Sequence, residues 1–395
     1  MQKSEYRVRG FTASAVKAGL KKDRALDLAL IVSEKETAVA GVFTTNKVVA
    51  APVIVSRENV KSGGARAIIA NAGNANACTG KAGLNDARRT AQLVADKLGI
   101  GVDEVLVAST GVIGQPLNVG RIAEALPSLI EGLSPDGIPH AAQAIMTTDS
   151  FAKISHFEGS AGRPYRILGI AKGAGMIMPN MATMLCFMMS DIRIDSHDLN
   201  GILSSSVETT FNRISVDGDT STNDTVLVMA NGMAGNRALT EADLKAFAKG
   251  LESVMGELAQ MIVRDGEGAT KVIHMEIKGA HSASDALKAV RTVGNSSLVK
   301  TACYGQDPNW GRIMAALGRA NIVMDEETVD IWVNDILIVS AGLGKGEAAE
   351  KKAAEIMLKK EYTLTIDLHQ GDFEDRMITC DLTHEYVSIN ANYRT

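Results

Sequence analysis

The stretch Lys172-Gly-Ala-Gly-Met-Ile-Met-Pro-Asn-Met-Ala-Thr-Met-Leu-Cys-Phe-Met-Met189 decides the expected fold. Two glycines and a Pro-Asn pair interrupt regular structure in its first half, whereas the apolar run over 184–189 predicts a buried strand. Thr183 would therefore begin a strand directly after a sharp bend, behind the small residue Ala182. Threonine favours strands, so this can be an ordinary strand residue. Alternatively, a threonine that becomes a chain terminus is an activated nucleophile, because its own amine serves as the base.

Composition limits the classes of function. The chain has 395 residues, of which 46% are hydrophobic and 22% are charged, which is typical of a soluble protein with two or three domain-sized units. A net charge of −5 and only 4% aromatic residues argue against partners such as nucleic acids and anionic membranes. No apolar run approaches the ~18 residues of a membrane span, and the N-terminal residues lack the apolar core of a signal peptide. We therefore expect a cytoplasmic protein.

Cysteine and histidine usage indicates neither disulfides nor metal. The four cysteines lie far apart in the sequence, as expected for reduced thiols in a chain without a secretion signal. The seven histidines show no spacing typical of a metal site. We expect no metal.

Hydrophobic periodicity predicts alternating strands and helices, an α/β arrangement of layered sheets covered by helices. Asn118 and Thr240 are expected to cap two of the helices. No linker-like stretch divides the chain, so we expect one interlocked body. The predicted strands cover 39–45, 66–70, 105–108, 184–189, 225–230, 271–278, 329–340 and 361–368, and the predicted helices cover 84–98, 119–132, 195–210 and 241–264.

Five further segments are rich in polar residues or glycine. Each can be a simple turn or helix cap, as asparagine and glycine often are. Three allow a chemical interpretation: a hydroxyl and a backbone N–H in 108–112 could face a developing oxyanion, 146–150 could form a polar wall for a substrate, and Glu267 between two glycines could hold an ammonium group. The C-terminal residues, rich in amide and aromatic groups, suggest docking into a site. These segments are 71–80, 108–112, 146–150, 263–270 and 386–395.

Residues 172–185 closely resemble the self-processing segment of the ornithine acetyltransferase (glutamate N-acetyltransferase) family. The chain departs from that pattern only at Ala174, where serine is common. The resemblance extends over nearly the whole chain, and the sequence is identified as a member of this family. The other matching segments are Gly10–Ala13, Gly41–Asn46, Asn71–Asn76, Ser109–Val112, Thr147–Asp149, Ser215–Asp224, Arg264–Thr270, Tyr304–Arg312, Cys380–Thr383 and Asn390–Thr395.

The resemblance implies a fold and a processing event. The fold would be a layered αββα sandwich of the self-processing, N-terminal-nucleophile-like type, with a smaller C-terminal α/β part. The chain would cut itself between Ala182 and Thr183, giving an α chain of residues 1–182 and a β chain of residues 183–395. The family implies that two copies of each chain assemble, a stoichiometry that the sequence itself does not reveal.

The resemblance also assigns roles to residues. Thr183 would be the nucleophile, and Thr110 with Gly111 would form the oxyanion hole. A further substrate-binding threonine of the family falls in the pair Thr147-Thr148, of which we favour Thr147. The implied substrate-binding residues are Thr147, Lys172, Thr183, Glu267, Asn390 and Thr395.

The implied reaction moves an acetyl group from N2-acetyl-L-ornithine to L-glutamate in the cyclic pathway of arginine biosynthesis, without a cofactor. Whether acetyl-CoA also serves as a donor is left open, as is the effect of Ala174 on the rate of cleavage. The nearest alternative is a self-cleaving N-terminal-nucleophile amidase or aminopeptidase, which would pass the acyl group to water. A non-enzymatic amino-acid-binding module is a second alternative, and it predicts an intact chain.

Overall fold

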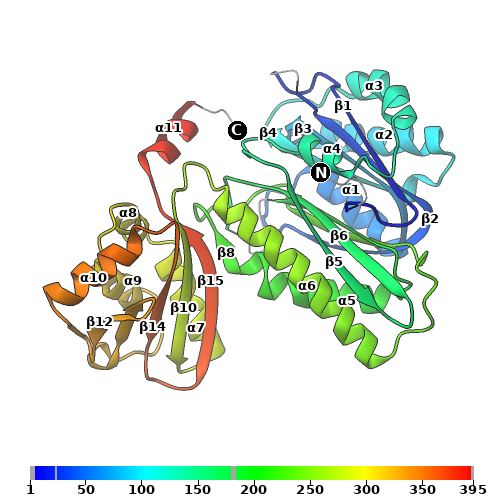
Figure 1. Cartoon of the computed structure of the whole chain (residues 1–395). Helices are drawn as coiled ribbons and strands as arrows, with labels where there is room; N and C mark the ends of the chain where they lie inside the picture. The colour runs from blue at the N-terminus through cyan, green and yellow to red at the C-terminus, as the bar shows by residue number, and fades with distance from the viewer. Residues whose placement is uncertain (1–4, 23–24, 179–183, 393–395) are drawn as a thin grey trace. The chain divides into compact units, whose positions relative to one another are not determined.

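The computed structural model describes residues 5–22, 25–178 and 184–392. The chain divides into two compact units, which are treated separately below (Figure 1). The first unit comprises the residues up to Asn212 together with Asp219–Ile262. The second comprises Arg213–Gly218 and the described residues from Val263 to Asn392. The division does not fall at residue 182, so sequence on both sides of Thr183 belongs to the first unit.

The first unit is built on one sheet in the strand order β4-β3-β2-β9-β7-β6-β5, with β1 paired to β2. Its strands are β1 (Phe11–Val16), β2 (Leu28–Phe43), β3 (Gly64–Asn74), β4 (Val105–Val112), β5 (Lys153–Ser160), β6 (Pro164–Lys172), β7 (Leu185–Ser190) and β9 (Thr225–Ala230). Its helices are α1 (Ala51–Asn59), α2 (Gly80–Leu98), α3 (Val119–Glu131), α4 (Ile138–Ala144), α5 (Ser196–Thr209) and α6 (Glu241–Arg264).

Strand β7 lies in the interior of this sheet, and all of its residues are buried. It pairs antiparallel with β6, where Lys172 is opposite Leu185, and parallel with β9, where Leu185 is opposite Thr225. An all-apolar run suits a strand that is covered on both faces, so the predicted buried strand is confirmed. The pairing also joins a strand that precedes residue 183 to strands that follow it.

Side chains alternate between the two faces of the sheet, as the strand period requires. On β2 and β3, Leu30 and Ile69 pack with residues of α1, α2 and α3. Their neighbours Ile31 and Ile68 face the opposite side, in a core shared with α4. Helix α6 runs alongside β5 and β6 in Figure 1, and a Cβ added to Gly169 of β6 would lie 2.8 Å from Leu258 of this helix.

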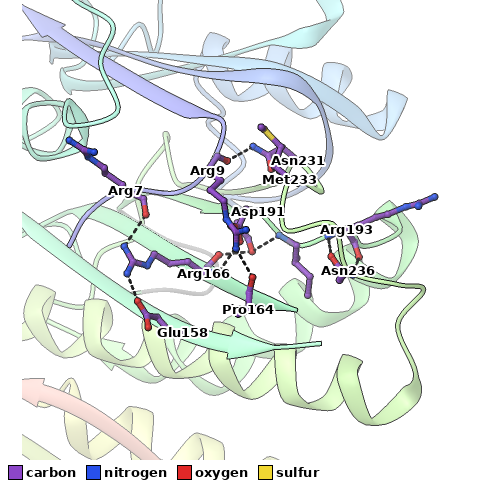
Figure 2. Close-up of polar contacts among 12 residues, drawn as sticks. Arg7, Arg9, Glu158, Pro164, Arg166, Asp191, Arg193, Asn231, Met233 and Asn236 are labelled. Carbon is purple, nitrogen blue, oxygen red and sulfur yellow. Dashed lines mark hydrogen bonds and ion pairs between the residues drawn. The ribbon is translucent and has the colours of Figure 1, made fainter. Parts of the chain in front are cut away.

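A network of polar contacts ties the N-terminal segment to the end of β7 (Figure 2). Asp191 follows that strand and accepts hydrogen bonds from the Arg166 backbone N–H at 2.8 Å and from Arg9 Nε at 2.6 Å. The Arg166 guanidinium also donates to the carbonyl of Arg7 at 3.0 Å, and Asn231 Nδ2 donates to the carbonyl of Arg9 at 2.8 Å. Asp191 therefore fixes the end of β7 that is remote from residue 184.

The second unit contains a sheet in the order β13-β12-β11-β14-β10-β15-β8. Its core is formed by one face of this sheet together with apolar residues of α7, α8, α9 and α10. The strands are β8 (Ile214–Ser215), β10 (Val272–Ala280), β11 (Asp330–Val333), β12 (Ile336–Ser340), β13 (Leu343–Gly344), β14 (Glu361–Asp367) and β15 (Phe373–Cys380). The helices are α7 (Ala283–Gly294), α8 (Ser297–Tyr304), α9 (Trp310–Gly318), α10 (Glu347–Met357) and α11 (His384–Asn392).

The predicted mixed α/β class with a smaller C-terminal α/β part is confirmed. The expected stacking of the two sheets into a sandwich concerns the placement of the two units and stays a prediction. The predicted helices correspond to α2, α3, α5 and α6, and the predicted strands all lie within or overlap observed ones. Asn118 caps α3 as expected, since its side chain accepts from the N–H of Arg121. Among the described residues, no helix has both the length and the apolar character needed to cross a membrane.

Replacing Ile69 by alanine should destabilise the first unit. Ile69 is 1% exposed in β3, so its truncation removes buried apolar contacts and leaves a cavity, which typically costs about 2–5 kcal/mol. Ile54 is the matched control, because it is 41% exposed on α1 and Ile54→Ala should change stability by less than about 1 kcal/mol. Urea unfolding followed by circular dichroism measures both, and equal losses would contradict the assignment of the core.

Candidate functional site

The end of β4 carries the predicted oxyanion residues Thr110 and Gly111. Gly111 lies opposite Gly73 in the parallel pairing of β3 and β4 and has φ +129°, a region that favours glycine. A Cβ at this position would lie 2.4 Å from the carbonyl carbon of Gly73. Only glycine fits there, so its backbone can approach close to the neighbouring strand.

Buried asparagines hold this end of β4 in place. Asn71 Oδ1 accepts a hydrogen bond from Ser109 Oγ at 2.6 Å, and its Nδ2 donates to the carbonyl of Asn74 at 2.9 Å. Asn223, which precedes β9, donates from Nδ2 to the carbonyls of Ala75 and Ser109 at 2.6 and 2.9 Å. The asparagine-rich segment at 71–76 therefore satisfies buried backbone groups beside the candidate site, which is the turn chemistry that its sequence allows.

Asp149 is the centre of a buried charged cluster. Its carboxylate accepts from Lys153 Nζ at 2.7 Å, and both side chains are fully buried. It also accepts from the backbone N–H groups of Gly173 at 2.6 Å and Thr147 at 2.9 Å. Lys172 Nζ lies 4.0 Å from the same carboxylate. One acidic side chain thus positions the end of β6 and the segment that begins β5.

The pKa of Asp149 reflects this environment. Burial alone would raise the pKa of the carboxyl group, because it disfavours the charged form. The positive charges of Lys172 and Lys153, with hydrogen bonds from Lys153 and Gly173, outweigh burial and lower the pKa to about 2. Asp149 is therefore ionised at neutral pH and balances part of the positive charge at the site.

Lys172 joins this cluster to the end of β4. Its Nζ donates to Thr110 Oγ1 at 3.3 Å, and the residue is only 5% exposed. An ammonium group can only donate, so the Thr110 oxygen is the acceptor and its own hydrogen is not used in this bond. Two residues that lie far apart in the sequence and were both predicted for the site are thus in contact.

The predicted nucleophile Thr183 and the cleavage residue Ala182 lie outside the described residues, as does Thr395. The chain is described again from Met184, whose backbone N–H donates to Asp224 Oδ1 at 2.6 Å. The carbonyl of Met184 accepts from the N–H of Thr225 at 3.0 Å. Two consecutive residues at the start of β9 therefore hold the peptide groups that directly follow residue 183.

The second unit brings Glu267 and Asn390 together. Glu267 lies in the loop after α6, half-buried, and its Oε2 accepts from Asn390 Nδ2 of α11 at 2.8 Å. Thr383 Oγ1 donates to the carbonyl of Gly268 at 2.8 Å, which attaches the start of α11 to this loop. A Cβ on Gly268 would lie 2.5 Å from the backbone nitrogen of Tyr386, so the close approach requires glycine. Helix α11 thus contacts the loop that carries Glu267, while docking of the C-terminal residues into a site stays a prediction.

The predicted site residues therefore form two sets, one in each unit. Thr110, Gly111, Thr147 and Lys172 belong to the first set, and Glu267 and Asn390 to the second. Lys172 contacts Thr110 directly, and Asp149 links it to the Thr147 backbone. No cluster of three or more potential metal-ligating His, Cys, Asp or Glu side chains occurs within residues 5–22, 25–178 and 184–392.

Comparison with protein families places almost the whole sequence in one family: residues 12–395 match the model of the ArgJ family. The chain belongs to the ArgJ family. A protein of Geobacter sulfurreducens named arginine biosynthesis bifunctional protein ArgJ is 51% identical over 98% of this chain and 100% of its own length. A glutamate N-acetyltransferase of Methanocaldococcus jannaschii is 47% identical over 98% of this chain and 97% of its own.

A solved structure of the ArgJ family is also similar. The arginine biosynthesis bifunctional protein ArgJ of Bacillus halodurans is 42% identical to this chain. The alignment covers 51% of this chain and 96% of the Bacillus halodurans chain, with a TM-score of 0.49. Membership rests on the near full-length sequence matches rather than on this partial structural similarity.

Several residues of this ArgJ-family site could not be assigned from the sequence. Asp149 stands within a quoted motif, but nothing in the sequence shows that it is buried with two lysines. Lys153 gives even less indication, because lysine is seldom buried. Asp224 ends the polar segment 215–224, and its contact with Met184 depends on the parallel pairing of β7 with β9. In the sequence, only the position of Asp224 directly before the predicted buried strand 225–230 could have indicated its role.

Replacing Asp149 by asparagine should destabilise the protein in a pH-dependent way. Removing one partner of a buried ion pair typically costs about 3–5 kcal/mol at neutral pH. The native pKa of about 2 lies below the ordinary value of 3.8, so the stabilising effect is present above pH 4 and is lost as the pH falls toward 2. The difference in free energy of unfolding between wild type and Asp149→Asn should therefore shrink by about 2 kcal/mol over that range.

Urea unfolding at several pH values measures this difference. The matched control is Asp96→Asn, because Asp96 is exposed on α2. Its substitution should leave the free energy of unfolding within about 0.5 kcal/mol of wild type at neutral pH. A difference for Asp149→Asn that does not change between pH 5 and pH 2 would contradict the assigned ionisation.

Proposed function

We propose that this protein transfers the acetyl group of N2-acetyl-L-ornithine to L-glutamate through an acetyl-Thr183 intermediate, in arginine biosynthesis. The observation that carries the proposal is the near full-length similarity to relatives named arginine biosynthesis bifunctional protein ArgJ and glutamate N-acetyltransferase. The contact of Lys172 with Thr110 supports it, because it joins a candidate carboxylate-binding group to a candidate oxyanion donor. Acetyl-CoA is a second donor to be tested.

Self-cleavage comes first in the proposed sequence of events. The Thr183 hydroxyl oxygen attacks the carbonyl carbon of Ala182, the peptide bond to the Thr183 nitrogen breaks, and the hydroxyl proton passes to that nitrogen. Water then opens the resulting ester and leaves a carboxylate on Ala182 and a free hydroxyl on Thr183. The pairing of β6 with β7 supports continued association, because these strands belong to different fragments after the cut.

Cleavage also creates the general base. The new α-amine of Thr183 has a reference pKa of ~7.7–8.0, so part of it is neutral near pH 7 and can accept the hydroxyl proton. The hydroxyl oxygen attacks the acetyl carbonyl of acetylornithine, and ornithine leaves with the proton. The α-amino group of glutamate then attacks the acetyl carbonyl, the ester bond to Thr183 breaks, and a proton from the amine passes to the Thr183 oxygen. Donor and acceptor react in turn, so the kinetics are ping-pong.

The described residues suit the charges of both steps. Thr110 can donate its hydroxyl hydrogen to the developing oxyanion, because that hydrogen is not used toward Lys172, and the Gly111 N–H can donate beside it. Lys172 suits a substrate carboxylate, while Glu267 suits the side-chain ammonium of ornithine. Asn390 and Thr395 complete the proposed binding set. We also propose that two α and two β chains assemble, and that the enzyme acts in the cytoplasm.

Thr183→Ala should yield one uncut chain without acetyl transfer, because the variant lacks both the attacking hydroxyl and the terminal threonine. Wild type should give two fragments on a denaturing gel, split between residues 182 and 183. After incubation with acetylornithine alone, mass spectrometry should find one added acetyl group on the fragment that begins at Thr183. Acetylglutamate should then form only when glutamate is supplied.

The control is Thr90→Ala, since Thr90 Oγ1 only donates to a carbonyl within α2. It should be processed and active like wild type. Cleavage of Thr183→Ala between 182 and 183 would overturn the proposal, and release of acetate at the same rate with and without glutamate would favour an amidase. An intact wild-type chain would favour a binding module. Supplying acetyl-CoA instead of acetylornithine tests the second donor.

Gly111→Ala should lower kcat by ~100-fold or more, because its Cβ cannot fit beside Gly73 and must displace the predicted oxyanion donor. Gly114→Ala is the control, because Gly114 also has a positive φ that disfavours other residues. Gly114 has φ +79°, but a Cβ there meets nothing within 4 Å. Its kcat should stay within about threefold of wild type. Steady-state assays of the cleaved enzymes make the comparison, and equal kcat values would contradict the role of Gly111.

A further inference from the structure

Asp224 holds the chain directly after residue 183, and none of the roles proposed above uses it. Its Oδ1 accepts from the Met184 N–H at 2.6 Å, while the following residue, Thr225, donates its N–H to the Met184 carbonyl at 3.0 Å. Asp224 is 3% exposed. Both backbone polar groups of Met184 are thus held by two consecutive residues that precede and begin β9.

This contact acts on the peptide group of residue 183. The Met184 nitrogen is bonded to the carbonyl carbon of Thr183, and the six atoms of a peptide unit are nearly coplanar. Fixing the direction of the Met184 N–H therefore restrains the peptide unit to which this N–H belongs. The acceptor of this hydrogen bond is the side chain of Asp224, not a backbone carbonyl of a neighbouring strand.

The carboxyl group itself is unusual. Within the part of the chain that the structure describes, Asp224 Oδ2 has no hydrogen-bond partner, although it is fully buried. Burial raises the pKa of Asp224 well above its ordinary value, opposed by the Met184 N–H, the Thr44 hydroxyl and the charge of Lys172. A carboxyl group that is buried with one oxygen unpartnered among the described residues calls for an explanation.

We propose that Asp224 is a positioning residue for Thr183, holding the 183–184 peptide in the orientation required for both self-cleavage and acetyl transfer. The inference rests on the function proposed above. In self-cleavage, the orientation of residue 183 directs its hydroxyl toward the preceding carbonyl. In acetyl transfer, the same anchor limits the movement of a residue that has become a chain terminus. Reduced freedom of a reacting group is a recognised source of rate.

Three substitutions test this role. Asp224→Ala removes the acceptor, so self-cleavage and the kcat of the cleaved fraction should each fall at least ~10-fold, corresponding to about one hydrogen bond. The KM for glutamate should stay within about threefold. Asp224→Asn keeps an oxygen in the same place and should restore both rates to within about fivefold of wild type. Asp224→Glu moves the acceptor by one methylene and should resemble Asp224→Ala.

The matched control is Asp191→Ala at the opposite end of β7. Asp191 is 1% exposed and also accepts a backbone N–H, but it contacts Arg9 and Arg166 rather than Met184 (Figure 2). It should lower stability without slowing cleavage or kcat. Time courses on denaturing gels and steady-state kinetics supply the readouts. If Asp224→Ala is insoluble, the contrast between Asp224→Asn and Asp224→Glu gives the same test.

The inference is overturned if Asp224→Ala and Asp224→Glu are cleaved and active like wild type. It is also overturned if Asp191→Ala slows cleavage and kcat as strongly, or if the Asp224 variants change KM while kcat stays constant. These results are separate from a failure of the proposed function, which would appear in wild type as an uncut chain or as absent acetyl transfer.

Discussion

The hydrogen bonds and ion pairs of the buried Asp149 carboxylate are the constraint on which the candidate site residues of the first unit depend. Two lysines, two backbone N–H groups and one acidic side chain meet where β5 begins and β6 ends. Because this group of charges is secluded from water, its geometry is restricted far more than that of a surface ion pair. Lys172 is held in reach of Thr110 as a consequence, and the candidate oxyanion region gains a fixed positive charge.

Much of the fold follows from local patterns. The long helix α6 has apolar residues at three- and four-residue steps, and Thr240 caps it by accepting from the N–H of Asp243 at 3.3 Å. Strands β7 and β9 are continuous apolar runs. In contrast, β2 begins at Leu28, far before the predicted start at residue 39. Its first part was missed because the polar residues 33–36 interrupt the apolar pattern, at the point where the pairing of β2 with β3 shifts register. Strand β6 was not predicted, since it begins at a proline and contains Gly169.

The site was predictable to a different degree. Motif resemblance supplied Thr110, Lys172, Glu267 and Asn390, and the structure adds direct contacts within each pair. What the sequence could not supply is tertiary in origin. The burial of Lys153 and the contact between Asp224 and Met184 arise from strand pairing between distant segments. Such positions are recognised only when the register of the sheet is known, because no local propensity distinguishes them.

The antiparallel pairing of β6 with β7 also has a consequence for assembly. If the chain is cut between these strands as proposed, neighbouring strands of one sheet become parts of two molecules. The precursor can form its sheet as an intramolecular event, at a rate independent of concentration. The mature protein, once unfolded, must bring two separate polypeptides together, so its recovery becomes bimolecular and its apparent stability depends on dilution. The protein then folds only once as a single chain, before cleavage. After cleavage, the native state persists because it unfolds slowly and not because it refolds repeatedly.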